Sequence, residues 1–414
     1  MEKVYELLKK YAKQMVSLGY PIGGAAMLAF ETEDGVYGTI HGAKLDDLRP
    51  EDVEKLRISN LPMSAAGMKA MVYSQTPYCQ RCLAEGVPFR ASIDDMAQII
   101  GPAVYIADGR PKEKKNGKSL AKAVRHSTGA FVLLGFDGKG KGAGYTITFG
   151  RNLYEAVVAM AVLEKSAEIT TLAERIGGVK PIRKFEAKLM RAVYKRKYSK
   201  SEEDVKNAEL ESGVIETVEE VNSDEGHKSR EQLLREQLVE YGKKLVRTGL
   251  VQGTWGNISA RLDDKYMIVT PSGLDYERLT AKDMVKVEID TLKYEGSIKP
   301  TSEKGLHAEI YKRRADVGSV IHTHSKYCCV YAAAEKSIDV TNPDMRAVFG
   351  NEVKLAKYGL PGTDQLKKNT ADAMGENFGC IMSHHGMAVC GKDLETAFGN
   401  AEKLEECAKI SLYR

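Results

Sequence analysis

Long apolar runs are absent from this sequence of 414 residues. No stretch reaches the roughly 18 consecutive apolar residues of a membrane-spanning helix. The start, MEKVYELLKK, carries charges where a signal peptide would be apolar. We therefore expect a cytoplasmic protein with no membrane partner.

Cysteine is scarce and irregularly placed. The 7 cysteines are an odd number without the spacing of a disulfide framework, which indicates a reducing compartment. The segment YCQRC holds Cys79 and Cys82, but a single pair without a second pair or a nearby histidine is only a weak zinc signal. A loop or buried thiols are the favoured interpretation.

Aromatic residues and net charge are also low. Aromatics make up 7% of the chain, with one Trp, and the formal charge is +4. Nucleic-acid binding usually needs a basic surface or aromatic side chains on which bases stack. We expect no nucleic-acid partner, and the 43% of hydrophobic residues fits a globular protein.

The length predicts more than one domain, because single cores rarely grow this large. Residues 197–230 are dense in charge and have no aromatic residue after Tyr198, which is typical of a linker. This places one domain at residues 1–196 and a second at 231–414.

The two halves resemble each other in sequence. The first opens LLKKYAKQMVSLGY and the second QLVEYGKKLVRTGL, each a helical pattern ending at a glycine, Gly19 or Gly249. Further on, MSAAGMKAMVY parallels TSEKGLHAEIY, and NLYEAVVAMAVLEKSAEI parallels DLETAFGNAEKLEECAKI. We infer two copies of one fold.

The copies differ at polar positions. The second half contains a set that the first lacks: Asn257, Glu303, His322, His324 and His385. In the first half Met27 lies opposite Asn257 and Ala65 opposite Glu303, while His41 and His126 fall elsewhere. The first half is therefore expected to be a degenerate copy without metal ligands.

The segment VIHTHSKY predicts a metal site. His322 and His324 stand two apart after a β-branched run, so on a strand they point the same way. In GCIMSHHGMAVCG, His385 precedes a glycine that allows a tight turn. Three histidines leave a position open, as in catalytic zinc sites. A histidine on a strand is, taken alone, more often a hydrogen-bonded core residue.

Zinc chemistry needs a group that moves protons, and Glu303 in KPTSEKGLHAEIY is the candidate. Ser302 could cap the following helix, with Glu303 in its first turn, although an ordinary carboxylate at a helix start has the same sequence pattern.

Neutral hydrogen-bond donors for a phosphate are expected in turns, although small residues are common in turns for other reasons. The candidates are Gly256, Asn257, Ser272, Gly273, Thr301 and Ser302.

With these residues in place, the second half resembles the class II aldolase/adducin family over about residues 231–412. The matching motifs are QGTWGNIS, TPSGLDYERLTAKDM, KPTSEKGLHAEIY, VIHTHSKY, GLPGTDQL and SHHGMAVCGKDLETA. The resemblance implies an α/β fold of two tandem three-layer α/β/α domains, each with a central, mainly antiparallel sheet. It also implies metal ligands at His322, His324 and His385, and acid–base chemistry at Glu303. The phosphate pocket would consist of the six turn residues, and His384, where the family usually has Asn, would not be a ligand.

The resemblance implies zinc-dependent retro-aldol cleavage of a phosphorylated sugar to dihydroxyacetone phosphate and an aldehyde. Family epimerases usually carry Asp where Glu303 stands, and family aldolases carry a tyrosine-bearing tail that does not follow CAKISLYR here. The proton donor to the aldehyde is therefore unassigned.

Epimerase, dehydratase or decarboxylase chemistry on the same site remains an alternative, as does a non-catalytic adducin-like assembly module. The family also implies a homo-oligomer.

Overall fold

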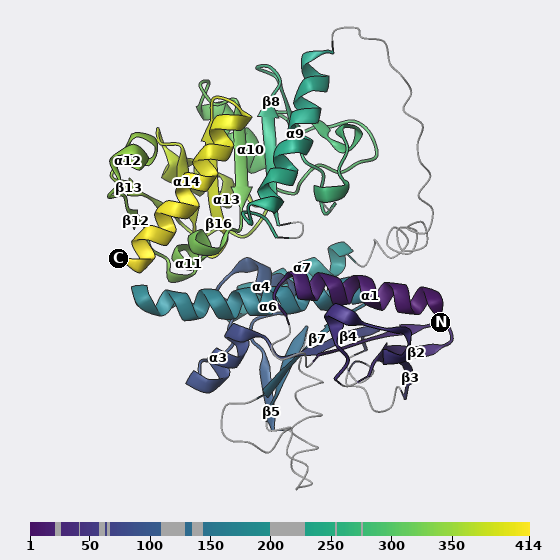
Figure 1. The fold of residues 1–414 in the computed structure, drawn as a ribbon. Coiled ribbons are helices and arrows are strands. Elements are labelled where there is room, and N and C mark those ends of the chain that lie inside the picture. Colours follow the sequence, from purple (N-terminus) through teal and green to yellow (C-terminus); the bar gives the residue numbers. More distant parts are fainter. Residues whose placement is uncertain are drawn as a thin grey trace. The chain divides into compact units, whose positions relative to one another are not determined.

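The computed structural model describes residues 1–20, 26–40, 42–57, 63, 67–108, 129–134, 144–198, 228–252, 255–274 and 276–414. The chain divides into two compact units. Unit 1 is Met1–Glu174 with Pro181–Ala192, and unit 2 is Arg175–Lys180 with Val193–Arg414 (Figure 1). Each unit is a mixed α/β structure built on a largely antiparallel sheet. Most of the predicted linker, together with His41, Ala65 and His126, lies outside the described residues.

Unit 1 carries the first seven strands and the first helices. The strands are β1 (Ala26–Thr32), β2 (Gly35–Thr39), β3 (Val53–Leu56), β4 (Ala70–Ser74), β5 (Tyr105–Asp108), β6 (Ala130–Leu134) and β7 (Gly144–Gly150). The helices are α1 (Glu2–Ser17), α3 (Pro77–Glu85), α4 (Asp94–Ile99) and α6 (Leu153–Ala173), with α7 (Lys184–Tyr198) beginning in this unit. Short 3-10 turns cover Leu45–Asp47, Pro50–Asp52 and Glu174–Ile176.

Unit 2 carries the remaining strands and helices. The strands are β8 (Gly256–Arg261), β9 (Tyr266–Val269), β10 (Val285–Glu288), β11 (Ser319–Thr323), β12 (Ile338–Asp339), β13 (Glu352–Val353), β14 (Leu355–Ala356), β15 (Gly379–Met382) and β16 (Gly386–Gly391). The helices are α9 (Arg230–Arg247), α10 (Lys304–Arg313), α11 (Lys326–Ala334), α12 (Pro343–Phe349), α13 (Asp364–Met374) and α14 (Leu394–Tyr413). Short 3-10 turns cover Tyr276–Arg278 and Ala281–Asp283.

The two main sheets have the same strand order. Unit 1 has the 7-stranded order β3-β2-β1-β4-β7-β6-β5, and unit 2 has β10-β9-β8-β11-β16-β15-β14. In both sheets the last pair, β5 with β6 and β14 with β15, is parallel, whereas the other pairs are antiparallel. The registers also agree, since Met27 faces Tyr73 across β1 and β4 as Asn257 faces His322 across β8 and β11.

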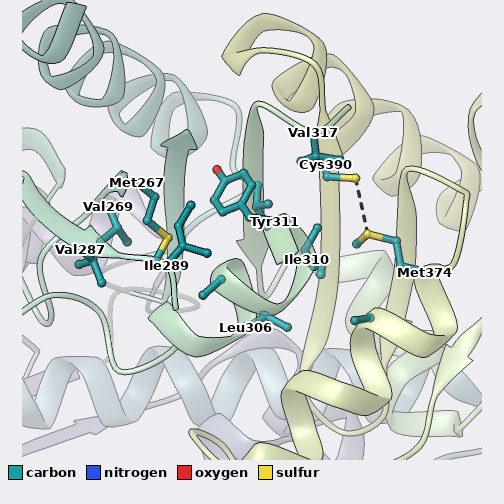
Figure 2. Close-up of a cluster of buried hydrophobic side chains, with 14 of the residues drawn as sticks. Met267, Val269, Val287, Ile289, Leu306, Ile310, Tyr311, Val317, Met374 and Cys390 are labelled. Atoms are coloured by element: carbon teal, nitrogen blue, oxygen red, sulfur yellow. Dashed lines mark hydrogen bonds between the residues drawn. The ribbon is translucent and has the colours of Figure 1, made fainter. Parts of the chain in front are cut away.

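In unit 2 the sheet is buried on both faces. Leu306 and Ile310 of α10 and Met374 of α13 join a cluster with alternate strand residues, among them Met267 and Cys390 (Figure 2). The intervening strand residues are also buried and point to the opposite face, which α9, α11 and α14 contact. Helices therefore contact both faces of this sheet. In unit 1, α1 and α6 supply the main cluster against the sheet.

Helix ends are built alike in the two units. Gly19 and Gly249 follow α1 and α9 with φ of 81° and 74°, the left-handed conformation that the sequence pattern predicts. Glu164 of α6 accepts hydrogen bonds from the main-chain N–H groups of Tyr78 and Cys79 at the start of α3. Correspondingly, Glu405 of α14 accepts from Ser325, Tyr327 and Cys328 at the start of α11.

One predicted parallel between the halves is wrong. Residues 70–73 of MSAAGMKAMVY lie on β4, whereas HAEIY of the supposed partner lies on α10. Strand β4 corresponds in strand order to β11 instead. Short apolar runs fit helix and strand periods equally, which explains the mispairing. Cys79 and Cys82 are buried free thiols on α3, as the favoured interpretation of YCQRC had it.

No helix within the described ranges combines the length and the apolar character needed to cross a membrane.

Replacing Glu405 with Gln should lower the stability of unit 2. The side chain accepts three hydrogen bonds at the N-terminus of α11, and an amide is a weaker acceptor with no charge to oppose the helix dipole. We expect a loss of about 2 kcal/mol in the free energy of unfolding. Glu406→Gln is the matched control, because Glu406 makes a surface ion pair with Lys409. Equal urea midpoints for the two variants would contradict this account of the α11 terminus.

Candidate metal centre

The three candidate histidines come from two neighbouring strands. His322 is the fourth residue of β11, and His324 follows that strand by one residue. His385 lies in the turn between β15 and β16, and β16 pairs with β11 so that His322 faces Ala388. A Cβ on Gly386 would lie 2.3 Å from the carbonyl oxygen of Thr323, so glycine lets the turn approach the end of β11. The register therefore brings His385 beside the pair.

The three imidazoles form a tight buried group. Their candidate ligand atoms all lie within 4.8 Å of one another. The Nε2 atoms of His322 and His324 are 2.9 Å apart, and the rings of His322 and His385 stack with 4.8 Å between centroids. The Nδ1 atom of His322 donates to the carbonyl oxygen of Met387 at 2.7 Å, which leaves its Nε2 facing the centre.

Glu303 completes this group. Its Oε1 lies 2.8 Å from Nε2 of His385, and its Oε2 lies 3.2 Å from Nε2 of His322. Glu303 is the N-cap residue of α10 without a side-chain cap bond, so the helix begins one residue later than expected and Ser302 does not cap it. The carboxylate is free to face the sheet because it does not cap its own helix.

Burial and neighbouring groups shift the pKa values of His322 and Glu303. Burial lowers the pKa of His322 to about 3, so its imidazole is neutral near pH 7. Burial alone would raise the pKa of Glu303, but its interactions with His322, His385 and His324 hold that pKa well below its usual range. Three imidazole nitrogens beside a carboxylate are a donor set that fits a divalent metal.

Polar residues behind Glu303 support its carboxylate, and two of them, His307 and Ser259, were not expected from the sequence. Asn257 donates from Nδ2 to Oε2 of Glu303 at 2.9 Å, and its Oδ1 contacts Nε2 of His307. His307 is completely buried, as is Ser259, which bonds its Nδ1. The only signal for His307 is its position four residues after Glu303, on the same face of α10.

The candidate phosphate residues lie around this centre in two adjoining segments. Ser272 donates its main-chain N–H to Lys299, and Thr301 donates to Thr270, which aligns the TPSG turn with the residues before α10. Gly273, with φ of 77°, and Ser302 are exposed, whereas Thr301 is buried and its Oγ1 accepts from the main-chain N–H of Glu303.

Asn257 and Gly256 occupy the adjacent end of β8. The side chain of Asn257 is engaged with Glu303 and His307, and Gly256 accepts the hydroxyl of Tyr276 at its carbonyl oxygen. Their part in phosphate binding stays a prediction. A pocket of about 120 Å³ opens beside Ser302 and Glu303, and its other side includes Gly362, Thr363 and Lys367.

His384 does not face the three histidines. Its Nε2 lies 3.4 Å from Glu335, and its ring meets the edge of Tyr358. Its φ of 59° is left-handed, a conformation that Asn adopts more readily than most residues. The turn therefore directs His384 and His385 to different surroundings.

In unit 1 other side chains occupy the corresponding positions. By register Tyr73 stands where unit 2 has His322, and Gln75 stands where it has His324. Ile147 pairs with Tyr73 as Ala388 pairs with His322. Gly144 precedes Ile147 by three residues, as His385 precedes Ala388, so Gly144 stands at the position of His385. Tyr73 stacks on Tyr145 at 4.3 Å, and Gln75 donates to the carbonyl oxygen of Gly144. None of these three positions offers an imidazole.

Comparison with known proteins places the similarity in unit 2. The family model described as the class II aldolase and adducin N-terminal domain matches residues 236–412. The 5-deoxy-D-ribulose 1-phosphate aldolase of Bacillus thuringiensis serovar kurstaki is 33% identical over 177 residues, which are 42% of this chain and 83% of that protein. The L-fuculose phosphate aldolase of Escherichia coli K12 is 32% identical over 179 residues, 43% of this chain and 82% of that protein. A solved L-fuculose 1-phosphate aldolase structure is 35% identical, covers 43% of this chain and 84% of its own, and has a TM-score of 0.41.

The burial of His307 predicts a pH dependence of stability. Its folded pKa is lowered from 6.5 to about 4 by burial. As pH falls below 6.5 the unfolded chain gains this proton before the folded protein does, so stability is lost between about pH 6.5 and 4 and is unaffected below. The loss amounts to about 3 kcal/mol. In metal-free protein, His307→Gln should show a correspondingly shallower decline of unfolding free energy across this window. Parallel curves for the two proteins would refute the assignment.

Proposed function

This chain belongs to the class II aldolase and adducin family, and from that premise we propose that it is a metal-dependent sugar-phosphate aldolase. The substrate is a ketose 1-phosphate, and its cleavage releases dihydroxyacetone phosphate and an aldehyde. The relatives named for 5-deoxy-D-ribulose 1-phosphate and L-fuculose phosphate support this substrate class.

The observation that carries the proposal is the buried group of three imidazoles facing one carboxylate. His322, His324 and His385 would hold a divalent cation, for which zinc is the best match to three neutral nitrogen ligands. Among the described residues, His322 and His385 are the titratable groups within 3.2 Å and 2.8 Å of the Glu303 carboxylate, so it lies beside the proposed metal rather than against a lysine or arginine. An adducin-like assembly module would have no use for such a centre.

The chemistry divides between the cation and the protein. A bound cation would act as a Lewis acid for the negative charge that develops as the carbon–carbon bond breaks. Glu303 removes or returns the proton at the dihydroxyacetone phosphate carbon, and it is held in the ionised form that a base requires. Asn257 keeps one carboxylate oxygen fixed through its N–H, so the proton is moved by an oriented group.

The substrate phosphate is assigned to the turn residues beside the centre. Two aligned segments offer the hydroxyls of Ser272, Thr301 and Ser302 and the main-chain N–H of Gly273. Neutral donors of this kind bind a phosphate without adding a charge next to Glu303. Holding the unreactive end in this way fixes the reacting carbons relative to the centre.

Unit 1 is proposed to be a degenerate copy of the same domain. The identical strand order and the matching carboxylate at the start of α3 and α11 support a common fold. Tyr73, Gln75 and Gly144 provide no imidazole, so we propose one metal per chain, bound in unit 2.

Replacing His385 with Asn should remove the metal and abolish aldol cleavage. The change deletes one nitrogen ligand. The matched control is His384→Asn, which alters the neighbouring residue that faces Glu335. The control variant should keep one metal per chain, since Asn tolerates the left-handed backbone at that position. Metal would be quantified in both proteins, and cleavage of 5-deoxyribulose 1-phosphate and L-fuculose 1-phosphate followed by triose phosphate release. Wild-type protein that binds no divalent metal when zinc is supplied would sink the proposal.

Replacing Glu303 with Gln should preserve the metal and suppress turnover. The amide keeps the size of the side chain but has no proton-accepting oxygen of suitable basicity. A loss of about 10² to 10⁴ in kcat is expected, equivalent to about 3–5 kcal/mol in the barrier. The measurement is kcat alongside metal content for the purified variant. Turnover close to wild type would show that another group moves the proton.

A further inference from the structure

The polar side chains behind Glu303 form one continuous hydrogen-bonded row. Asn257 and Ser259 lie two apart on β8, and Glu303, His307 and Tyr311 lie four apart along α10. Side chains two apart on a strand, and four apart on a helix, share one face. The row runs from Glu303 to Asn257, then His307, Ser259 and Tyr311.

The chemistry of each group fixes the direction of every hydrogen bond. An ionised carboxylate only accepts, so Asn257 must present its N–H groups to Glu303 and its Oδ1 to His307. That oxygen also only accepts, so His307 carries its proton on Nε2. The bare Nδ1 of His307 then accepts the hydroxyl proton of Ser259 at 2.7 Å. The oxygen of Ser259 accepts in turn from the hydroxyl of Tyr311 at 2.8 Å.

Burial keeps bulk water away from the middle of this row. His307 and Ser259 have no exposed surface, and Asn257 and Tyr311 are 4% and 2% exposed. Burial also lowers the pKa of His307 to about 4, so the imidazole is neutral at pH 7 and has one donor and one acceptor. A neutral ring with a single donor matches the pattern that Asn257 and Ser259 demand.

We propose that His307 is a positioning residue for the base: its Nε2–H holds the amide of Asn257, which aims an N–H at Glu303. Without that donor the amide loses the contact that holds its oxygen, and its N–H is held less firmly against Glu303. The two amide orientations have nearly the same shape, so the proton on His307 reinforces the orientation that the carboxylate requires. The kinetic consequence of this inference rests on the proposed function.

The kinetic test compares two substitutions at His307 with a matched control. His307→Leu should lower kcat about 10- to 100-fold while KM and bound metal stay unchanged, the scale typical of residues that orient the groups around a metal. His307→Gln, whose amide N–H can still donate to Asn257, should restore most of kcat. Thr370→Val is the control for losing a buried hydrogen bond, since Thr370 on α13 is fully buried and donates to the carbonyl oxygen of Leu366. It should lower stability and leave kcat unchanged.

A double variant separates positioning from general damage. If His307 acts through Asn257, the kcat of His307→Leu/Asn257→Ala should equal that of Asn257→Ala alone. The inference would be overturned if the kcat losses of the two single variants multiplied in the double variant. It would also be overturned if His307→Leu kept the wild-type kcat.

A measurement on the wild-type protein tests the protonation of His307 without an activity assay. With ¹⁵N-labelled histidine, NMR should show His307 neutral and protonated on Nε2 from about pH 5 to 8, in zinc-loaded and zinc-free protein alike. The signals of His322, His324 and His385 should instead respond to zinc. A proton on Nδ1 of His307, or a charged ring, would overturn the inference even if His307→Leu fails to fold. If no ketose phosphate is cleaved by wild type, the proposed function fails, while this spectrum still decides the role of His307.

Discussion

Within the part of the chain that the structure describes, Glu303 is a buried carboxylate without a lysine or arginine partner, and unit 2 depends on this constraint. Moving an ion out of water costs several kcal/mol, and Glu303 is 8% exposed. One N–H from Asn257 and the start of α10 offset part of this cost. A cation held among the three imidazoles would balance the carboxylate, so the proposed metal would belong to the electrostatics of the fold as well as to the reaction.

The same sheet order without that constraint appears in unit 1. There Tyr73 and Tyr145 stack and Gln75 bonds a main-chain carbonyl, so the corresponding positions are satisfied by neutral contacts. Shared strand order and shared helix capping persist while the reactive residues differ. Architecture and chemistry are therefore separable in this chain, and function has to be argued from the residues at each site.

Several features of the site could be predicted because they depend on short-range periodicity. Two histidines two apart on a strand necessarily share a face, and a His-Gly turn after an apolar strand lies at a sheet end. His307 escaped notice because a buried histidine inside a helix has the same sequence signature as any core residue. The contact of Asn257 with Glu303 also escaped notice, since a loop motif does not reveal that its amide turns toward the carboxylate. The predicted pairing of MSAAGMKAMVY with TSEKGLHAEIY was wrong for a related reason, because periodicity does not separate a short strand from a helix.

The central claim is that the histidines of unit 2 hold a metal beside Glu303. X-ray absorption at the metal edge of the purified full-length protein tests this directly. The account predicts three imidazole nitrogens at about 2.0–2.1 Å and no sulfur ligand. A sulfur shell at about 2.3 Å, which would place the metal on cysteines, or a spectrum without imidazole scattering, would contradict it.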